Sequence, residues 1–409
     1  MLKPLFQPLK LASGGELPNR IVKASMEESL ATEDQLPSDA LIELYRQWGR
    51  GGCGLLLTGN VMVDHMAMTG PGGVALEANT ELGRFQDWAE AAKAGGSKVW
   101  MQINHPGRQV FAGMKGKALS ASDIPLDLGK NSKLFAQPKA MSEEEIQDVI
   151  QRFAATAKNA VAAGFDGVQI HAAHGYLITQ FLSPLSNKRS DQWGGSLENR
   201  ARLLLEVVKA VRAELPADAA VGIKLNSADF QRGGFQPEDA KQVVAMLDNM
   251  GVDLIELSGG SYETPAMQGR TSDERTLARE AYFLEFAEEI AQSTDIAIMT
   301  TGGVRRLEIA EKVVSSGVAA VGIATALAYH PSLPNHWQNN SMLDAIVPPI
   351  EMKNKDLAAF ATMAVVKRQM RRMGNGKKPL AKPSPLFSLI KEQFRSSKLQ
   401  KRYRERFAS

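Results

Sequence analysis

Residues 142–176 read SEEEIQDVIQRFAATAKNAVAAGFDGVQIHAAHGY, and this stretch contains one complete helix-to-strand unit. Ser142 and the acidic residues after it are typical of a helix start, and apolar residues then recur at helical spacing up to residue 164. A glycine ends the helical pattern, as a left-handed helix C-cap prefers. The β-rich run GVQIH (167–171) follows, so the stretch predicts a helix, a turn and a short strand.

The same change from helix to strand recurs along the chain, and a glycine marks it in RGGCGLLL, NMGVDLIEL and SSGVAAVGI. Eight units spread over about 330 residues predict an α/β fold of the (β/α)8 TIM-barrel type, because an open doubly wound sheet would fit six units better. The predicted strands are 20–25, 54–61, 98–104, 167–171, 221–226, 254–259, 297–303 and 320–327.

The chain is predicted to divide into a barrel, residues 1–345, and a basic helical C-terminal extension, residues 346–409. From residue 351 onward there are sixteen Lys and Arg against four Asp and Glu. Since the whole chain carries a net charge of +3, the extension holds about +12 and the remainder about −9.

The extension is expected to form two helices, 354–373 and 386–407, joined by the linker GNGKKPLAKPSP. One interpretation is an arm that packs on the barrel or on a second subunit of a homo-oligomer. The other is a contact with an anionic surface, although nucleic acid is not an expected partner. Packing would bury the apolar residues of the second helix, which are Leu386, Phe387, Leu389, Ile390 and Phe394.

Composition excludes several classes of protein. With 409 residues, 44% hydrophobic, the chain is long enough for a large core. No apolar run approaches the roughly 18 to 20 residues that cross a bilayer, and neither a span nor a signal peptide is expected. Cys53 is the single cysteine, which excludes an internal disulfide, a four-thiolate zinc site and a cysteine-ligated iron–sulfur cluster. The expected location is the cytoplasm.

His171, His174 and Tyr176 follow directly after a predicted strand, where TIM barrels place their chemistry. Three interpretations stay open at this point. The histidines could be structural, or they could ligate a metal, although six histidines and no HExxH helix leave the other ligands unidentified. Alternatively, two imidazole N–H groups converge on a carbonyl or nitro oxygen while the phenol donates a proton. This third arrangement needs a separate source of reducing or nucleophilic power.

Two glycine-containing segments, GGVRR (302–306) and GIATAL (322–327), follow the last two predicted strands. Many TIM barrels bind phosphate between these two loops, although glycine pairs there also serve simple turn geometry. The pattern would suit a phosphorylated cofactor.

Three segments together resemble the old yellow enzyme family of FMN-dependent NAD(P)H oxidoreductases, or ene-reductases. The most specific is HAAHGYLITQFLSPLSNKRSDQWGGSLENR (171–200), which combines the histidines, the tyrosine and a long loop at fixed spacing. LFQPLKL (5–11) with LPNRIV (17–22), and QINHPGR (102–108), resemble the opening and the third strand. The likeness runs from about residue 4 to 335.

The resemblance implies FMN as cofactor, NADPH or NADH as reductant, and electron-poor alkenes, nitro compounds or quinones as substrates. His171 and His174 would bind the activating oxygen of the substrate, Tyr176 would protonate its α-carbon, and Gln102 would face the flavin pyrimidine ring. The residues implied to contact FMN are Ala24, Ser25, Met26, Glu27, Asn60, Gln102, Lys224, Gly302, Gly303, Ala324 and Thr325. The loops HPGRQVFAGMKG (105–116) and SYETPAMQGRTS (261–272) would select the substrate.

The sequence departs from the family pattern at the cofactor. Lys224 stands where the family commonly has an arginine beside flavin N1, so the charge is kept but the fork geometry is lost. The Gly-Arg pair that usually holds the phosphate is replaced by Ala324 and Thr325. Backbone N–H groups, with Arg305 or Arg306, are expected to offset this loss.

Glu27 stands where the family often has Cys or Thr against flavin O4. An ionised carboxylate there would oppose reduction, so we expect it to be protonated, turned away, or to lower the reduction potential. Two rival functions stay open: a metal-dependent barrel hydrolase or lyase that uses the histidine pair, and a degenerate barrel that binds a ligand or partner without turnover.

Overall fold

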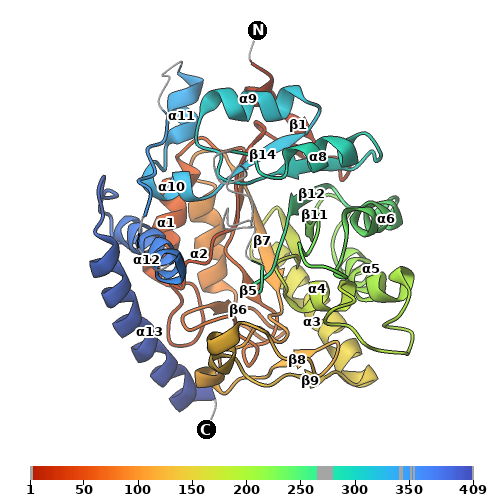
Figure 1. Ribbon diagram of the computed structural model, residues 1–409. Coiled ribbons are helices and arrows are strands. Elements are labelled where there is room, and N and C mark those ends of the chain that lie inside the picture. Colours follow the sequence, from red (N-terminus) through yellow and green to blue (C-terminus); the bar gives the residue numbers. More distant parts are fainter. Residues whose placement is uncertain (1–2, 265–279, 340–343, 351, 353–354, 408–409) are drawn as a thin grey trace.

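The barrel closes through eight parallel strands among the residues that the structure describes. The computed structural model describes residues 3–264, 280–339, 344–350, 352 and 355–407 (Figure 1). The strands neighbour one another in the order β10-β11-β12-β13-β14-β3-β4-β7, and a β10–β7 pairing closes the ring, which confirms the predicted (β/α)8 TIM barrel. Their bounds are β3 (Ile21–Lys23), β4 (Leu55–Leu57), β7 (Lys98–Asn104), β10 (Gly167–Ala172), β11 (Ala220–Asn226), β12 (Leu254–Ser258), β13 (Ala297–Thr300) and β14 (Ala320–Ile323).

Helices follow the strands along the chain. The start of α3 matches its prediction, because Ser142 and Glu145 form a capping box in which each side chain accepts the other's backbone N–H. The helices within the barrel are α1 (Asp39–Gly49), α2 (Gly83–Ala92), α3 (Glu143–Ala162), α4 (Leu177–Leu182), α5 (Leu197–Glu214), α6 (Pro237–Leu247), α8 (Leu284–Ala291), α9 (Leu307–Ser315), α10 (Thr325–Tyr329) and α11 (Leu333–Gln338).

The strand predicted over 320–327 is too long. β14 ends at Ile323, and α10 begins at Thr325. Ala326 and Leu327 are buried in this helix, and a short apolar run does not by itself distinguish a buried strand from a buried helix.

Short elements complete the barrel. β5 and β6 extend the sheet beside β7, whereas the β1–β2 hairpin and the β8–β9 pair lie outside it. They are η1 (Pro4–Phe6), β1 (Leu9–Lys10), β2 (Glu16–Leu17), β5 (Val61–Met62), β6 (Val74–Ala75), η2 (Ala112–Met114), β8 (Leu119–Ser120), η3 (Gly129–Leu134) and β9 (Lys139–Ala140).

Side chains that point into the barrel form an apolar layer and a polar layer. Paired residues of neighbouring parallel strands point to the same face of the sheet. The register therefore identifies which residues of each strand point into the barrel. The apolar layer closes the base around Trp100, with Leu9 and Leu17 of the β1–β2 hairpin among its members. Two residues further along their strands, the interior positions are polar: Gln102, Gln169, Lys224 and Glu256.

The C-terminal extension forms two helices, α12 (Lys355–Gly374) and α13 (Pro385–Phe407), as predicted. They lie side by side along one flank of the barrel, where α12 packs against α1 (Figure 1, blue). No helix among the described residues is both long and apolar enough to span a membrane. The division of the chain at residue 345 stays a prediction.

The predicted burial of the apolar residues of α13 is wrong within the single chain. Phe394 is 76% exposed, and Leu386, Phe387 and Ile390 are also exposed, whereas Leu389 is half-buried. The helix turns another face to the barrel: Tyr403 is buried there. There Tyr403 packs with Met62, Met68 and Met114, and Phe407 packs against the same cluster, whereas the apolar stripe at the start of α13 is left on the surface.

Candidate active site at the carboxyl ends of the strands

A chain of hydrogen-bonded polar side chains crosses the barrel interior. Gln102 accepts from Ser25 (Oγ to Oε1, 2.8 Å) and donates to Gln169 (Nε2 to Oε1, 2.7 Å). Gln169 donates to Glu256 (2.9 Å), whose other oxygen lies 2.8 Å from Nζ of Lys224. The sequence predicts Ser25, Gln102 and Lys224 as site residues but not Gln169 and Glu256. The sequence feature that could have identified them is a polar residue between apolar neighbours within a predicted strand: Gln169 in GVQIH and Glu256 in LIELSG.

Lys224 and Glu256 form the ion pair of this polar layer. Lys224 is 5% exposed and Glu256 is fully buried. An ammonium group has three donors, so Lys224 can hold Glu256 and still donate to a bound ligand. The pair therefore places a cation in the interior without leaving its charge uncompensated.

His171, His174 and Tyr176 meet at the end of β10. The ring centroids of His171 and His174 are 5.0 Å apart, and those of His171 and Tyr176 are 4.8 Å apart, both in edge-to-face geometry. His174 has φ +63° and Gly175 has φ +75°, a left-handed turn whose glycine has no room for a Cβ. The backbone N–H of His174 donates to Oδ1 of Asn226 (3.0 Å), which holds the turn. The structure thus brings the three predicted side chains together.

Both imidazoles are neutral at pH 7. Burial, with the nearby Lys224 cation, lowers the pKa of His171 and His174 well below the usual value. A neutral ring has one donor and one acceptor nitrogen. Nδ1 of His171 accepts from the backbone N–H of Ala173 (3.2 Å), so Nε2 carries the proton. Nε2 of His174 lies 2.8 Å from Oγ of Ser258, and this hydroxyl determines which nitrogen of His174 donates elsewhere.

Tyr176 is a protonated phenol. Burial, the neighbouring Tyr262 and the charge of Glu27 raise the pKa of Tyr176 well above its usual value. Its Oη lies 3.0 Å from Oη of Tyr262, whose pKa is also raised by burial. The sequence does not single out Tyr262, although it lies in the loop predicted to select the substrate. Residues 265–272 of that loop lie outside the described part of the chain.

An aromatic wall continues from Tyr262. Its ring lies 5.9 Å from that of Phe135, which stacks on Phe111 at 4.8 Å. Phe111 belongs to the other predicted substrate loop, residues 105–116. The two loops therefore meet, through Phe135, beside Tyr176.

Glu27 is held by two partners. Its carboxylate lies 3.3 Å from Nζ of Lys367 on α12 and 2.7 Å from Oγ1 of Thr69. Burial alone would raise the pKa of Glu27, but these two partners outweigh it and the pKa is lowered. Lys367 also donates to Oγ of Ser29 (2.9 Å). Glu27 is therefore ionised and charge-paired, which the sequence does not predict because its partner is 340 residues away.

Gly302 and Gly303 follow β13 with φ values of +122° and +71°. A Cβ at either glycine would lie less than 3.0 Å from Tyr282, so the side chain of Tyr282 and the two glycines are in close contact. Ala324 is the residue before α10, in the adjacent loop. The two predicted phosphate loops are thus neighbours, with their backbone N–H groups at the same end of the barrel.

A cavity of about 430 Å³ opens beside these loops. Arg305 and Thr325 line its barrel side, while Thr362 and Val366 of α12 line the opposite side. Arg305 is bound through Nε to Glu280 (3.1 Å), and Arg306 binds the same carboxylate (2.8 Å). Both candidate replacements for the missing arginine are therefore already charge-paired.

The donor set fits a phosphorylated flavin. Asn104, two residues beyond Gln102 on β7, has both side-chain polar atoms buried without a partner among the described residues. A buried amide without a partner is costly, and the edge of a flavin pyrimidine ring offers both donors and acceptors. Gln102 and Lys224 could hold the ring, and the glycine loop with Thr325 could hold the phosphate.

The other predicted cofactor residues lie close by. Ala24 is buried at the end of β3, and Met26 is partly buried. Asn60 is partly buried after β4 and borders a small crevice with Glu27.

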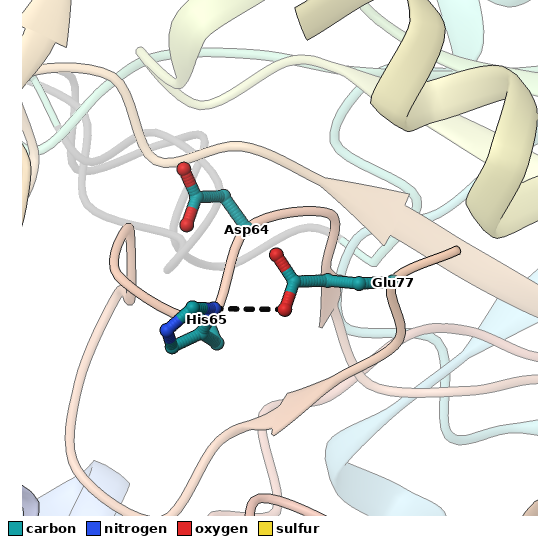
Figure 2. A group of neighbouring side chains, drawn as sticks. All are labelled: Asp64, His65 and Glu77. Atoms are coloured by element: carbon teal, nitrogen blue, oxygen red, sulfur yellow. Dashed lines mark hydrogen bonds and ion pairs between the residues drawn. The ribbon is translucent and has the colours of Figure 1, made fainter. Parts of the chain in front are cut away.

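Asp64, His65 and Glu77 form the group of potential metal ligands found among the described residues (Figure 2). His65 binds Glu77 through Nδ1 (2.8 Å). Lys117 lies 3.0 Å from Asp64, and Arg152 lies 2.8 Å from Glu77. Protein cations already balance both carboxylates, so the group is an ion-pair network that fixes the loop after β4.

Comparison with known proteins agrees with this geometry. Residues 4–344 match the NADH:flavin oxidoreductase / NADH oxidase family. The NADH-dependent flavin oxidoreductase nadA of Aspergillus parasiticus is 37% identical over 391 residues, which cover 92% of this chain and 87% of the relative.

Two solved structures share the fold at 24% identity. A 2-naphthoyl-CoA reductase complex superposes with a TM-score of 0.79 over 92% of this chain, which spans 58% of that chain. An old yellow enzyme homologue from Zymomonas mobilis superposes with a TM-score of 0.71 over 84% of this chain and 95% of that one.

Proposed function

The chain belongs to the NADH:flavin oxidoreductase / NADH oxidase family, that of the old yellow enzymes, and from this premise we propose that it is an FMN-dependent reductase of electron-poor C=C bonds. The reaction takes an activated alkene, NADH and a proton to the saturated product and NAD⁺. NADH is preferred to NADPH because the Aspergillus relative is described as NADH-dependent. Bound FMN would supply the chemistry of hydride transfer between the nicotinamide and the β-carbon of the alkene.

The observation that carries the proposal is the pair of neutral imidazoles beside a protonated phenol. Negative charge grows on the carbonyl or nitro oxygen of the substrate as hydride arrives. The Nε2–H of His171 is free to donate to that oxygen, and His174 can do so when Ser258 donates to its Nε2. Preorganised donors of this kind are worth about 3 to 4 kcal/mol each when removed singly.

Tyr176 supplies the proton. Its raised pKa keeps the proton on Oη at pH 7, and the hydrogen bond to Tyr262 (3.0 Å) orients the hydroxyl and provides a second exchangeable proton. The phenol would therefore protonate the α-carbon of the alkene on the face opposite to hydride delivery.

The polar layer would receive the flavin ring. Lys224 would place its positive charge beside the pyrimidine ring, where charge accumulates on reduction, and Glu256 holds it there. Gln102 is oriented by Ser25 and Gln169 on either side. The backbone of Gly302, Gly303 and Thr325 would bind the phosphate.

The experiment that tests this function is the visible absorption spectrum of the purified protein under anaerobic conditions. Flavin bands that bleach with NADH and return on addition of 2-cyclohexenone are the expected result. Bands that bleach but do not return with enones, nitroalkenes or quinones would contradict the proposed substrate class. A colourless protein that takes up no added FMN would overturn the proposal and favour a barrel that binds a ligand or partner without turnover.

A further inference from the structure

We propose that the C-terminal extension is part of the reaction site, with Lys367 of α12 as a positioning residue that holds Glu27 and offsets its negative charge beside the flavin. The inference rests on the proposed function, because it assumes a flavin in the barrel. It extends that function by assigning a charge-setting role to a segment outside the barrel.

Glu27 faces the reacting residues as well as α12. It follows β3 at the mouth, and its charge reaches both Tyr176 and Tyr262 strongly enough to raise their pKa. A Cβ on Gly70 would lie 3.7 Å from Oε1 of Glu27 and 3.9 Å from the Phe111 ring, so the carboxylate borders the aromatic wall. An unpaired charge at this point would therefore act on the whole site.

Two contacts hold the side chain of Lys367 against this carboxylate. Its Nζ lies 3.3 Å from Glu27 and 2.9 Å from Oγ of Ser29, and its side chain is 20% exposed. The preceding residue, Val366, lines the cavity that also contains Arg305. One turn of α12 thus touches two parts of the predicted cofactor site.

The rest of the extension keeps α12 in place. Gln47 of α1 donates to the backbone oxygen of Met373 (2.8 Å), and Arg371 binds Glu392 of α13 (2.5 Å). α13 is anchored in turn on the segment that follows Glu27: Arg395 donates to the backbone oxygen of Ser29 (2.5 Å). The segment after β3 is therefore held from both helices of the extension.

Arg402 adds a further anchor, because it binds Glu33 at 2.7 Å. Tyr403 donates to the backbone oxygen of His65 at 3.0 Å, which ties α13 to the loop after β4 as well. These contacts fix α13 along both loops that carry the partners of Lys367 and Glu27.

Two roles for the ion pair make different predictions. If Lys367 only anchors α12, its loss lowers stability slightly, since partly exposed ion pairs contribute little, and leaves the midpoint potential of the flavin unchanged. If it offsets the charge of Glu27, its loss leaves a carboxylate that opposes the negative charge gained on reduction. The midpoint potential of the bound flavin then falls.

The test is the two-electron midpoint potential of the bound flavin, measured by anaerobic dye equilibration, in the wild type and in K367M, K367R, E27Q and the E27Q/K367M double variant. We expect K367M to lower the potential, K367R to keep it near the wild type, and E27Q to raise it. The E27Q/K367M double variant should return the potential toward the wild-type value, because the two charges act on the flavin in opposite directions and both are gone.

Thermal unfolding of each variant separates the charge effect from misfolding. A folded, flavin-loaded K367M with the wild-type potential would overturn the inference, as would a double variant with the same potential as K367M alone. If K367M fails to fold, E27Q still tests the inference. A midpoint potential in E27Q equal to that of the wild type would overturn it. A wild-type protein without flavin overturns the proposed function first, and this outcome is visible before any variant is made.

Discussion

The Nε2 atom of His174 lies 2.8 Å from the Oγ atom of Ser258, across the interior from β10 to β12. Since the ring is neutral, a hydroxyl that donates to Nε2 leaves Nδ1 as the protonated nitrogen. Ser258 therefore controls which nitrogen of His174 can donate to another group, which in the proposed function is the substrate oxygen.

We expect Ser258→Ala to weaken the binding of phenol-type ligands by about threefold to tenfold, the loss that corresponds to one net hydrogen bond. Flavin absorbance should be retained, and ligand binding is measured by the spectral shift of the bound flavin. Ser293→Ala, a serine between α8 and β13, provides the matched control. Equal affinity in S258A and wild type would show that Ser258 does not set the state of His174.

Tyr176→Phe should slow alkene reduction by about 10² to 10⁴-fold, the usual contribution of a general acid, while flavin reduction by NADH stays unchanged. The reason is that, in the proposed function, the phenol protonates the substrate and takes no part in flavin reduction. Stopped-flow measurement of the two half-reactions checks this. Tyr262→Phe should have a smaller effect on the same step, because Tyr262 acts through the hydroxyl of Tyr176. Equal loss in both half-reactions would contradict the assignment.

The barrel and the histidine-tyrosine cluster could be predicted from the sequence because their signals are local. The glycine before four of the predicted strands and the capping box at Ser142 depend on neighbours in the chain, as does the spacing of His171, His174 and Tyr176. Their side chains all come from one strand end. Local structure therefore determines where they lie.

The contacts that complete the site are not local. Glu27 and Lys367 are separated by 340 residues, and His174 and Ser258 by 84. The sequence pattern does not indicate such a pair, because each partner alone resembles an ordinary surface charge or a serine at the end of a strand. The buried face of α13 is wrongly predicted for a related reason: the choice between two faces of an amphipathic helix depends on the surface it meets.

Stability should fall below neutral pH because of buried histidines, among them His105. Burial lowers the pKa of His105 to about 4, so the folded protein leaves it neutral while the unfolded chain, with a pKa of about 6.5, takes up a proton. Unfolding therefore binds protons between these values, and the free energy of unfolding decreases as pH falls from about 6.5 toward 4. At pH 5 this residue should account for about 2 kcal/mol of lost stability.

Urea unfolding at pH 7 and pH 5 measures the effect of His105. His105→Gln should lose less stability between the two pH values than the wild type, whereas H336Q, at an exposed histidine on α11, serves as the matched substitution. If the free energy of unfolding falls equally between pH 7 and pH 5 in the wild type and in H105Q, other groups account for the loss of stability in acid.

Lys23 and Glu28 form a buried pair on the outer side of β3. Nζ of Lys23 lies 3.7 Å from Glu28 and donates to the backbone oxygen of Leu57 (2.8 Å) and to Tyr45 (3.0 Å). Lys23→Met leaves a buried carboxylate without its cation, which should cost about 3 to 5 kcal/mol. The K23M/E28Q double variant should recover part of this loss. Lys209→Met, at an exposed lysine of α5, should cost less than about 1 kcal/mol, and chemical unfolding measures all three.

The exposed stripe of α13 predicts that two copies of the chain associate through the C-terminal extension. Ile390 and Phe394 lie one turn apart and are 48% and 76% exposed, while the extension carries about +12 against about −9 on the barrel, so a second copy offers both an apolar face and an opposite charge. Ile390→Ser with Phe394→Ser should lower the mass measured by light scattering with little change in the unfolding temperature, because both side chains are exposed in the single chain. Leu134→Ser, at an exposed leucine of η3, should leave the mass unchanged. A wild-type protein that is monomeric at all concentrations would rule out this interface. So would an oligomer that dissociates only at high salt and does so equally in the wild type and in the double variant.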